Sequence, residues 1–250
     1  MTTVLVDIGN SRIKWGLRDG SGVVQIASLQ HDQESWSARV QQLPSGVLHW
    51  LIASVVPAAT AEFTAWCAAR RDSFHAVLAS DIPLTLNVRQ PHLLGVDRAL
   101  AALAAHHRAA PGQAAIAVCA GTAITVELVD EAGVYQGGAI APGPWLMAQS
   151  LHAHTAKLPL LAIHGFTVST APGKATAEAI TAGINAAVLG CLRLMIERLA
   201  VGCTQPPLVC LAGGSLGEIT AAHLPGPWMV QGPHLLVLEG LAYLGRASTE

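Results

Sequence analysis

Apolar and polar residues alternate in three short runs at the start of the chain, which is the pattern of half-buried β-strands. The runs cover residues 2–8, 12–18 and 22–27, and tight turns separate them at Gly9-Asn10 and at the sequence DGSG, residues 19–22. The chain is therefore expected to open with a β-meander.

Beyond residue 30 the pattern changes repeatedly between helical and extended periods. The expected elements are a helix near 34–42, a strand at 48–56, a helix after Pro57 that runs to Arg71, a strand at 74–79 and an Ala-rich helix from Gly95 to Ala109. This succession of strands and helices indicates an α/β protein.

The opening pattern returns after Ala114. The segments VLVDIGNSRIKWGL and IAVCAGTAITVEL align without gaps about 112 residues apart, and each continues through a glycine turn into a third strand. Such self-similarity predicts a duplicated unit, and the alternative is a chance likeness between two β-meanders. A helix at 175–199, the strand PLVCLAG, a Gly-Gly turn into a helix, a strand at WMVQ and a last helix at 233–246 complete the second half.

The two halves are expected to be subdomains, because the second meander marks a new start and neither linker nor low-complexity sequence lies between them. Their predicted ranges are residues 1–112 and 113–250. With so short a connection, the halves are expected to pack around a shared cleft.

Composition and charge narrow the function to small-molecule chemistry. The formal net charge is −2 and no run of Lys or Arg is present, which excludes nucleic-acid binding through a basic face. The five cysteines show neither a CxxC pair nor a zinc-ligand spacing, and they indicate reduced thiols in the cytoplasm. No signal-peptide pattern opens the sequence, and the uncharged stretch 132–156 contains two prolines and several polar residues, so no membrane partner is expected.

The first chemically informative motif is DIGNSRIK, residues 7–14, at a strand-turn-strand junction. Gly9 allows a ligand to approach the backbone, whose N–H groups can face phosphate oxygens, and Asp7 is placed to hold a hydrated Mg²⁺. Arg12 or Lys14 would offset phosphate charge. The alternative is an ordinary hairpin turn in which Gly9 and Asn10 supply positive φ angles.

Two further motifs point to the same chemistry. Gly121-Thr122 occupies the equivalent turn of the second repeat, where small residues suit a γ-phosphate. Gly95-Val96-Asp97-Arg98 enters the Ala-rich helix, where Asp97 would deprotonate a substrate hydroxyl and Arg98 would bind an anionic substrate. The alternative for Asp97 is a charge that only stabilises the helix N-terminus.

Five motifs together resemble the type III pantothenate kinases, a family that also contains proteins named Bvg accessory factors. The segments DIGNSRIKWG, PHLLGVDRALAAL, AGTAITVEL, GGAIAPG and GKATAEAITAGI occur in the order and approximate spacing seen in that family. The resemblance extends over nearly the whole chain.

The resemblance implies two tandem ribonuclease H-like subdomains of the actin-like ATPase type, with a mixed central sheet in each. It also implies ATP-dependent phosphorylation of pantothenate at the entry to coenzyme A synthesis, Mg²⁺, a monovalent cation (K⁺ or NH₄⁺) and a homodimer. By motif position, Asp97 would be the general base. The other implied contacts are Asp7, Ile8, Gly9, Asn10, Ser11, Arg12, Ile13, Lys14 and Thr122 for ATP, Gly95, Val96, Asp97, Arg98 and Thr176 for pantothenate, and the turn Gly213-Gly214 near the adenosine.

Three positions depart from the pattern of the family. Cys119 stands where the family has an Asp that binds the monovalent cation, and a thiol with a pKa of about 8.5 is mostly neutral at pH 7 and a poor ligand for a hard cation. K⁺ dependence is therefore left open. Glu127 replaces an Asp and extends its reach, and Val88 replaces a Tyr that contacts the substrate.

Two other functions remain open at this point. A regulatory accessory protein that keeps the fold without catalysis would agree with Cys119 and Val88, although the retained Asp7, Asp97 and Thr122 argue against it. The resemblance also assigns the chain to the superfamily of acetate kinase, sugar kinases, Hsp70 and actin. A sugar kinase or a phosphate-ester hydrolase of that superfamily is the third possibility, and the GVDR segment favours the pantothenate kinase over it.

Overall fold

The computed structural model describes residues 2–19, 22–163, 171–213, 219 and 221–247. Its residues form two compact units, Met1–Ala104 with Leu235–Glu250, and Ala105–His234. The boundary between residues 112 and 113 remains a prediction. The structure adds that the C-terminal segment packs with the N-terminal residues.

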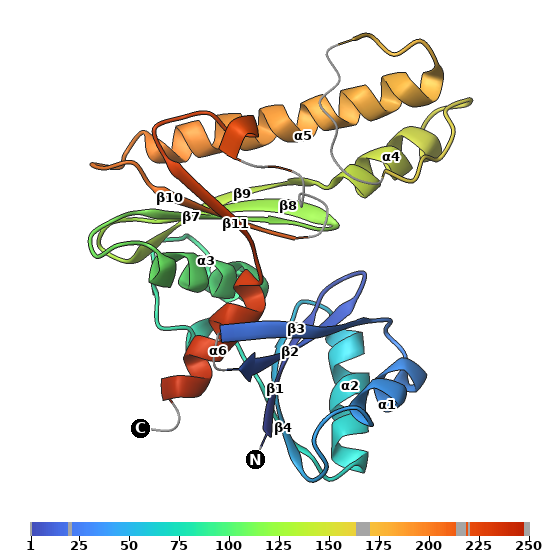
Figure 1. Ribbon diagram of the computed structural model, residues 1–250, viewed down its shortest axis with the longest axis vertical. Helices are drawn as coiled ribbons and strands as arrows, with labels where there is room; N and C mark the ends of the chain where they lie inside the picture. The colour runs from blue at the N-terminus through green and yellow to red at the C-terminus, as the bar shows by residue number, and fades with distance from the viewer. Residues whose placement is uncertain (1, 20–21, 164–170, 214–218, 220, 248–250) are drawn as a thin grey trace. The chain divides into compact units, whose positions relative to one another are not determined.

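The first unit contains a mixed sheet with the strand order β3-β2-β1-β4-β5 (Figure 1). β1 pairs antiparallel with β2, as β2 does with β3, whereas β1, β4 and β5 run parallel. The strands are β1 (Thr2–Ile8), β2 (Ile13–Asp19), β3 (Gly22–Leu29), β4 (Leu48–Ser54) and β5 (Ser73–Ala76). The opening meander is thus confirmed, and the strand expected at 74–79 is shorter because a 3₁₀ turn, Ala79–Asp81, follows it.

Helices cover both faces of this first sheet. They are α1 (Gln33–Val40), α2 (Pro57–Ala69), α3 (Val96–Arg108) and α6 (Leu236–Ala247). β1 alternates accordingly: Val4, Val6 and Ile8 pack with α1 and α2, and Leu5 packs with α3 and α6. Asp7 belongs to the same alternation as Leu5, which directs its side chain to the face of α3. A strand of two residues, Thr85–Leu86, and a 3₁₀ turn, Pro91–Leu93, precede α3 and were not expected from the sequence.

A cluster of aromatic rings fills the core between this sheet and the helices α1 and α2. Trp15 and Trp50 meet edge to face with ring centroids 4.8 Å apart, and Phe63 lies 5.5 Å from Trp50. Behind the cluster, the side chain of Asp72 is 1% exposed and accepts hydrogen bonds from Trp50 Nε1 at 3.0 Å, from Leu48 N at 3.0 Å and from Arg70 Nε at 2.9 Å. One carboxylate thereby holds β4 and the end of α2 together.

Replacing Asp72 by alanine is expected to lower the free energy of unfolding by about 2–4 kcal/mol, because two buried N–H donors and a partly buried guanidinium lose their acceptor. Urea denaturation measures the loss. Asp81→Ala is the matched control, since this carboxylate is 40% exposed and its interactions with Leu78 N, Ser80 Oγ and the exposed His75 lie at the surface. Equal losses in the two variants would contradict a stabilising role of the buried Asp72 network.

The second unit contains a second mixed sheet, in which five strands follow the order β11-β10-β7-β8-β9. β7, β8 and β9 pair antiparallel, and β7, β10 and β11 run parallel, so the strand pairing of the first unit is repeated. The elements are β7 (Ala115–Ala120), β8 (Ala123–Val129), β9 (Val134–Pro142), α4 (Pro144–Ala153), α5 (Thr176–Ala200), β10 (Leu208–Ala212), a 3₁₀ turn (Ala221–His223) and β11 (Met229–His234). The predicted duplication is confirmed by topology.

Strand pairing corrects the gapless alignment of the two repeats by one residue. In the first hairpin Ile8 pairs with Ile13, and in the second Ala120 pairs with Ile124. The second turn is therefore one residue shorter, and the structural equivalent of Lys14 is Thr125 rather than Val126. Hydrophobic alternation agrees with this shift, because the core residues Ile13 and Trp15 of the first repeat correspond to Ile124 and Val126 of the second, not to Thr125 and Glu127.

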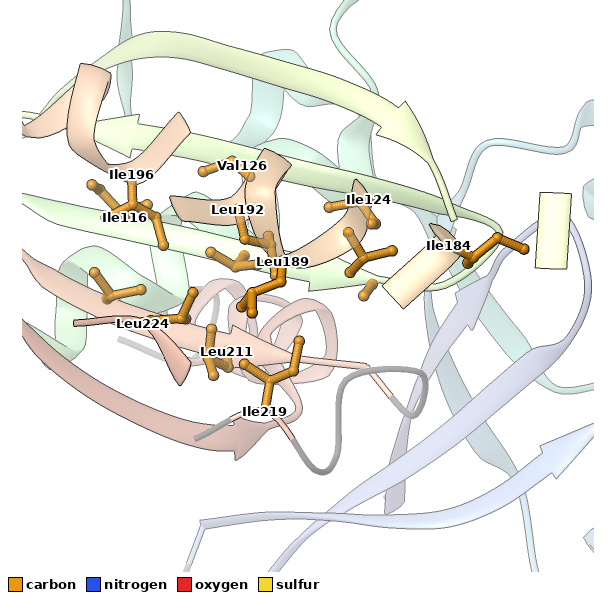
Figure 2. Close-up of a cluster of buried hydrophobic side chains, with 14 of the residues drawn as sticks. Ile116, Ile124, Val126, Ile184, Leu189, Leu192, Ile196, Leu211, Ile219 and Leu224 are labelled. Atoms are coloured by element: carbon orange, nitrogen blue, oxygen red, sulfur yellow. The ribbon is translucent and has the colours of Figure 1, made fainter. Parts of the chain in front are cut away.

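Helix α5 packs along one face of the second sheet (Figure 2). Its buried residues recur at helical spacing, and Val188, Leu192 and Ile196 meet Ile116, Val126 and Leu211 of the strands. α5 is also, among the residues that the structure describes, the one helix long and apolar enough to cross a membrane by length and composition. Core helices of soluble proteins pass the same test, so this is weak evidence for a span.

Candidate functional site

The first hairpin places a buried carboxylate beside a lysine. Asp7 lies near the end of β1 and is paired in register with Lys14 of β2. Its Oδ2 is 3.3 Å from Lys14 Nζ, and the two side chains are 10% and 44% exposed. A carboxylate at a strand end offers the hard oxygen ligands that suit Mg²⁺, and the positive charge of the partly exposed Lys14 side chain attracts anions.

The turn itself lacks the backbone conformation that would require glycine. Neither Gly9 nor Asn10 has a positive φ, and a Cβ at Gly9 would have Arg12 O as its only near neighbour, at an ordinary 3.5 Å. Gly9 N donates a hydrogen bond to Arg12 O at 3.1 Å. The alternative in which Gly9 and Asn10 serve only a positive-φ turn is therefore wrong.

The remaining residues of the DIGNSRIK segment divide into exposed and buried side chains. Asn10, Ser11 and Arg12 are exposed at the turn, whereas Ile8 and Ile13 are 0% exposed and belong to the core next to α1 and α2. The side chains of these two isoleucines therefore hold the hairpin on the core.

The Gly95–Arg98 segment brings a second carboxylate to the face of the first sheet toward which Asp7 points. Asp97 Oδ1 accepts a hydrogen bond from Arg98 N at 2.8 Å, and Val96 is buried among residues of α3 and α6. A Cβ on Gly95 would lie 2.6 Å from Asp97 Oδ1. Gly95 therefore leaves the space that the carboxylate of Asp97 occupies.

The environment of Asp97 raises the pKa of its carboxyl above the usual value. Burial is the largest cause, and the negative charge of Asp7 acts in the same direction, while the N–H and the guanidinium of Arg98 partly oppose them. Such a carboxylate has a stronger tendency to take up a proton than an exposed one, which is the property required of a general base.

The second hairpin repeats the open turn. Gly121 N donates to Ala123 O at 2.9 Å, Gly121 has no positive φ, and no heavy atom lies within 4 Å of its Cβ position. Two other glycines approach this turn closely. Gly143 N donates to Thr122 O at 2.9 Å, and Gly213, with φ +105°, would place a Cβ 2.0 Å from Ala120 O. Gly214, expected beside it, lies outside the described residues.

The departures from the family pattern occupy different environments. Cys119 is half-buried and pairs in register with Thr125, at the level of the turn. Glu127 is 0% exposed and accepts a hydrogen bond from Tyr135 OH at 2.7 Å, and a Cβ on Gly138 would lie 2.5 Å from Glu127 Oε2. Glu127 thus has a structural partner within its own sheet. Val88 is half-buried in the loop before α3.

Each unit also contains a hollow next to predicted site residues. A cavity of about 440 Å³ lies beside Val55, whose Cγ1 is 3.7 Å from the Cβ position of Gly95. In the second unit, exposed Thr176 at the start of α5 lines a mostly apolar cavity of about 1050 Å³ between α4 and α5. The structure therefore brings Asp7, Lys14 and Asp97 onto one face of the first unit. In the second unit, Thr122 lies in the turn of the hairpin, and Thr176 lies at the cavity between α4 and α5.

Comparison with known proteins decides the family. A sequence model described as type III pantothenate kinase matches residues 3–198. A type III pantothenate kinase from Alkalilimnicola ehrlichii is 32% identical to the chain, with 98% of each sequence covered. The chain belongs to the type III pantothenate kinase family.

Two further comparisons agree with this assignment. A type III pantothenate kinase from Herminiimonas arsenicoxydans is 34% identical, covering 88% of the chain and 89% of that protein. Among solved structures, a Sinorhizobium meliloti protein described as a 2-dehydro-3-deoxygalactonokinase superposes with a TM-score of 0.57 at 13% identity, covering 98% of the chain and 99% of that protein. The latter likeness concerns the fold alone, and with the two mixed sheets it confirms the predicted fold class. As members of a kinase family, such chains use ATP and a divalent metal.

Proposed function

We propose that this chain transfers the γ-phosphoryl group of ATP to the primary hydroxyl of pantothenate, which yields ADP and 4'-phosphopantothenate and begins coenzyme A synthesis. The observation that carries the proposal is the family match over residues 3–198, together with a half-buried Asp97 at the start of α3, on the face of the first sheet toward which Asp7 points. The regulatory alternative is not favoured, because the catalytic and phosphate-binding motifs are retained.

In this reaction Asp97 acts as the general base. Its carboxylate takes the proton of the hydroxyl as the hydroxyl oxygen attacks the γ-phosphorus, the bond from that phosphorus to the β–γ bridging oxygen breaks, and ADP leaves with the electron pair. Gly95, Val96 and Arg98 surround the substrate, and the guanidinium of Arg98 binds its carboxylate. Thr176 is the further pantothenate contact.

ATP is held by the two hairpins in this proposal. The backbone of residues 8–13, the exposed side chains of Asn10, Ser11 and Arg12, the ammonium group of Lys14 and the hydroxyl of Thr122 contact its phosphates. Asp7 would hold Mg²⁺ through water, and the bound metal would supply positive charge that offsets the negative charge of the phosphates. The Asp7–Lys14 ion pair keeps both groups at the hairpin.

The proposal extends to a cytoplasmic homodimer that acts without nucleic-acid or membrane partners. Cys119 occupies the position of the monovalent-cation ligand, and its thiol weakens any site for K⁺ or NH₄⁺. The functional test is ADP release by the purified protein with ATP, Mg²⁺ and pantothenate, with and without K⁺. We expect pantothenate-dependent turnover that changes little with K⁺; absence of turnover under every cation condition would contradict the proposed activity.

The pH dependence of the reaction follows from the raised pKa of Asp97. The base works only when ionised, so kcat/KM for pantothenate is expected to fall as the pH drops through this raised pKa, at a higher pH than the ordinary Asp value of 3.8 would give. A pH–rate profile from acid to neutral pH measures the position of this limb. A limb at or below the ordinary Asp value would contradict the assignment of Asp97 as base.

A further inference from the structure

Gly143 makes an unusually close backbone contact with the second turn. It immediately precedes α4, and its N–H donates to Thr122 O at 2.9 Å. A Cβ at this position would lie 2.2 Å from Gly121 O and 2.7 Å from Thr122 O, which is well inside van der Waals contact. Only a residue without a side chain allows α4 to begin at this distance from the turn.

The conformation of Gly143 does not itself require glycine. Its φ of −73° and ψ of 168° are extended values that any residue adopts. Its position is the N-cap of α4, where Ser, Thr, Asp or Asn would stabilise the helix by about 1 kcal/mol, and α4 has no side-chain cap. The helix therefore forgoes a cap at the residue that touches Gly121 and Thr122.

Gly213, the residue that follows β10, constrains the same turn. Its φ of +105° is in the region that favours glycine, and its Cβ position is 2.0 Å from Ala120 O and 2.9 Å from Ala120 N. Two glycines from separate elements thus enclose the consecutive peptide groups of residues 120–122. In contrast, no heavy atom lies within 4 Å of the Cβ position of Gly121. The turn is therefore in close contact where Gly143 and Gly213 approach it, and open on the side of the Gly121 Cβ position.

We propose that Gly143 is a positioning residue for ATP: through its hydrogen bond to Thr122 O and its contact with Gly121 O, it fixes the backbone that presents Thr122 to the nucleotide phosphates. This inference rests on the proposed function, in which Thr122 binds ATP. Pro144 assists, because a residue before proline is restricted to extended conformations and Gly143 is thereby held in the observed one.

The test compares Gly143→Ala with the wild-type protein in steady-state kinetics. The added methyl group must displace the turn, and a displacement of ~1 Å at a reacting group can cost on the order of 10²-fold in rate. We expect KM for ATP to rise about tenfold or more while KM for pantothenate stays within about twofold. Gly202→Ala is the matched control, because its Cβ position has no heavy atom within 4 Å and no ligand contact is assigned to it.

A binding measurement separates this inference from the proposed reaction. Calorimetric titration with a non-hydrolysable ATP analogue and Mg²⁺ measures nucleotide affinity, which does not depend on whether pantothenate is the acceptor. Gly143→Ala is expected to weaken that binding about tenfold. Unchanged nucleotide affinity, or equal changes in KM for both substrates, would overturn the role of Gly143. If Gly143→Ala is not recovered folded, Pro144→Ala decides by the same two readouts, because it relaxes Gly143 without adding atoms to the turn.

Discussion

Asp97→Asn is expected to lower kcat by about 10²–10⁴-fold, the usual contribution of a positioned general base, while KM for both substrates changes little. Asparagine has nearly the same size and keeps an oxygen that accepts the Arg98 N–H bond, but it takes up no proton. Steady-state ADP release with saturating ATP and Mg²⁺ measures the loss.

The same substitution is expected to raise the midpoint of thermal unfolding. Burial and the charge of Asp7 raise the pKa of Asp97, so the ionised carboxylate is disfavoured in the folded protein. The folded protein is therefore more stable at pH values where Asp97 is protonated. At neutral pH, the uncharged amide of Asp97→Asn would remove that cost, the trade-off between stability and activity that active sites commonly show. The control Glu62→Gln neutralises an exposed carboxylate on α2 and is expected to change neither property. Full activity of Asp97→Asn would exclude Asp97 as the base.

Gly121→Ala is expected to separate nucleotide binding from stability. Because Gly121 has no positive φ and open space around its Cβ position, alanine fits the fold, and the free energy of unfolding should stay unchanged or rise by up to about 1 kcal/mol. The methyl group would, however, occupy the space in front of the turn where the phosphates of ATP are proposed to bind. We expect KM for ATP to increase about tenfold or more.

Two measurements on the same preparations separate the effects of Gly121→Ala: urea denaturation gives the free energy of unfolding, and steady-state kinetics gives KM for ATP. Gly202→Ala again serves for comparison, since it is also open and far from any proposed phosphate contact in the sequence. A loss of stability with unchanged KM for ATP would mean that Gly121 serves the turn and not the nucleotide.

Much of the fold could be predicted from the sequence because strand alternation and helical periodicity are local properties. The meander at residues 2–29 and the buried stripe of α5 follow directly from the spacing of apolar residues. Pairing register depends instead on turn length and on contacts between distant segments. The packing of α6 with the N-terminal residues therefore became visible only in the structure. The strand pairing also corrected the gapless alignment of the repeats, although the apolar positions Ile124 and Val126, which match Ile13 and Trp15, already indicate the shorter second turn.

The candidate site shows a similar division. Asp7, Gly9, Asp97 and Thr122 could be selected from the sequence, because small residues and carboxylates at strand and helix ends are chemically distinctive. What the sequence could not reveal was the reason for each glycine. Gly9 and Gly121 lie in open turns, whereas Gly95 leaves space for a carboxylate and Gly143 for a backbone, and these differences depend on residues that the fold brings close.

Phosphorus NMR or mass spectrometry of the product formed from ATP, Mg²⁺ and pantothenate would test the proposed reaction directly. The expected result is 4'-phosphopantothenate in amounts equal to the ADP released, with formation lost in Asp97→Asn and retained in Glu62→Gln. ADP release that is independent of pantothenate, or an absence of phosphorylated pantothenate with K⁺ and NH₄⁺ both supplied, would contradict it.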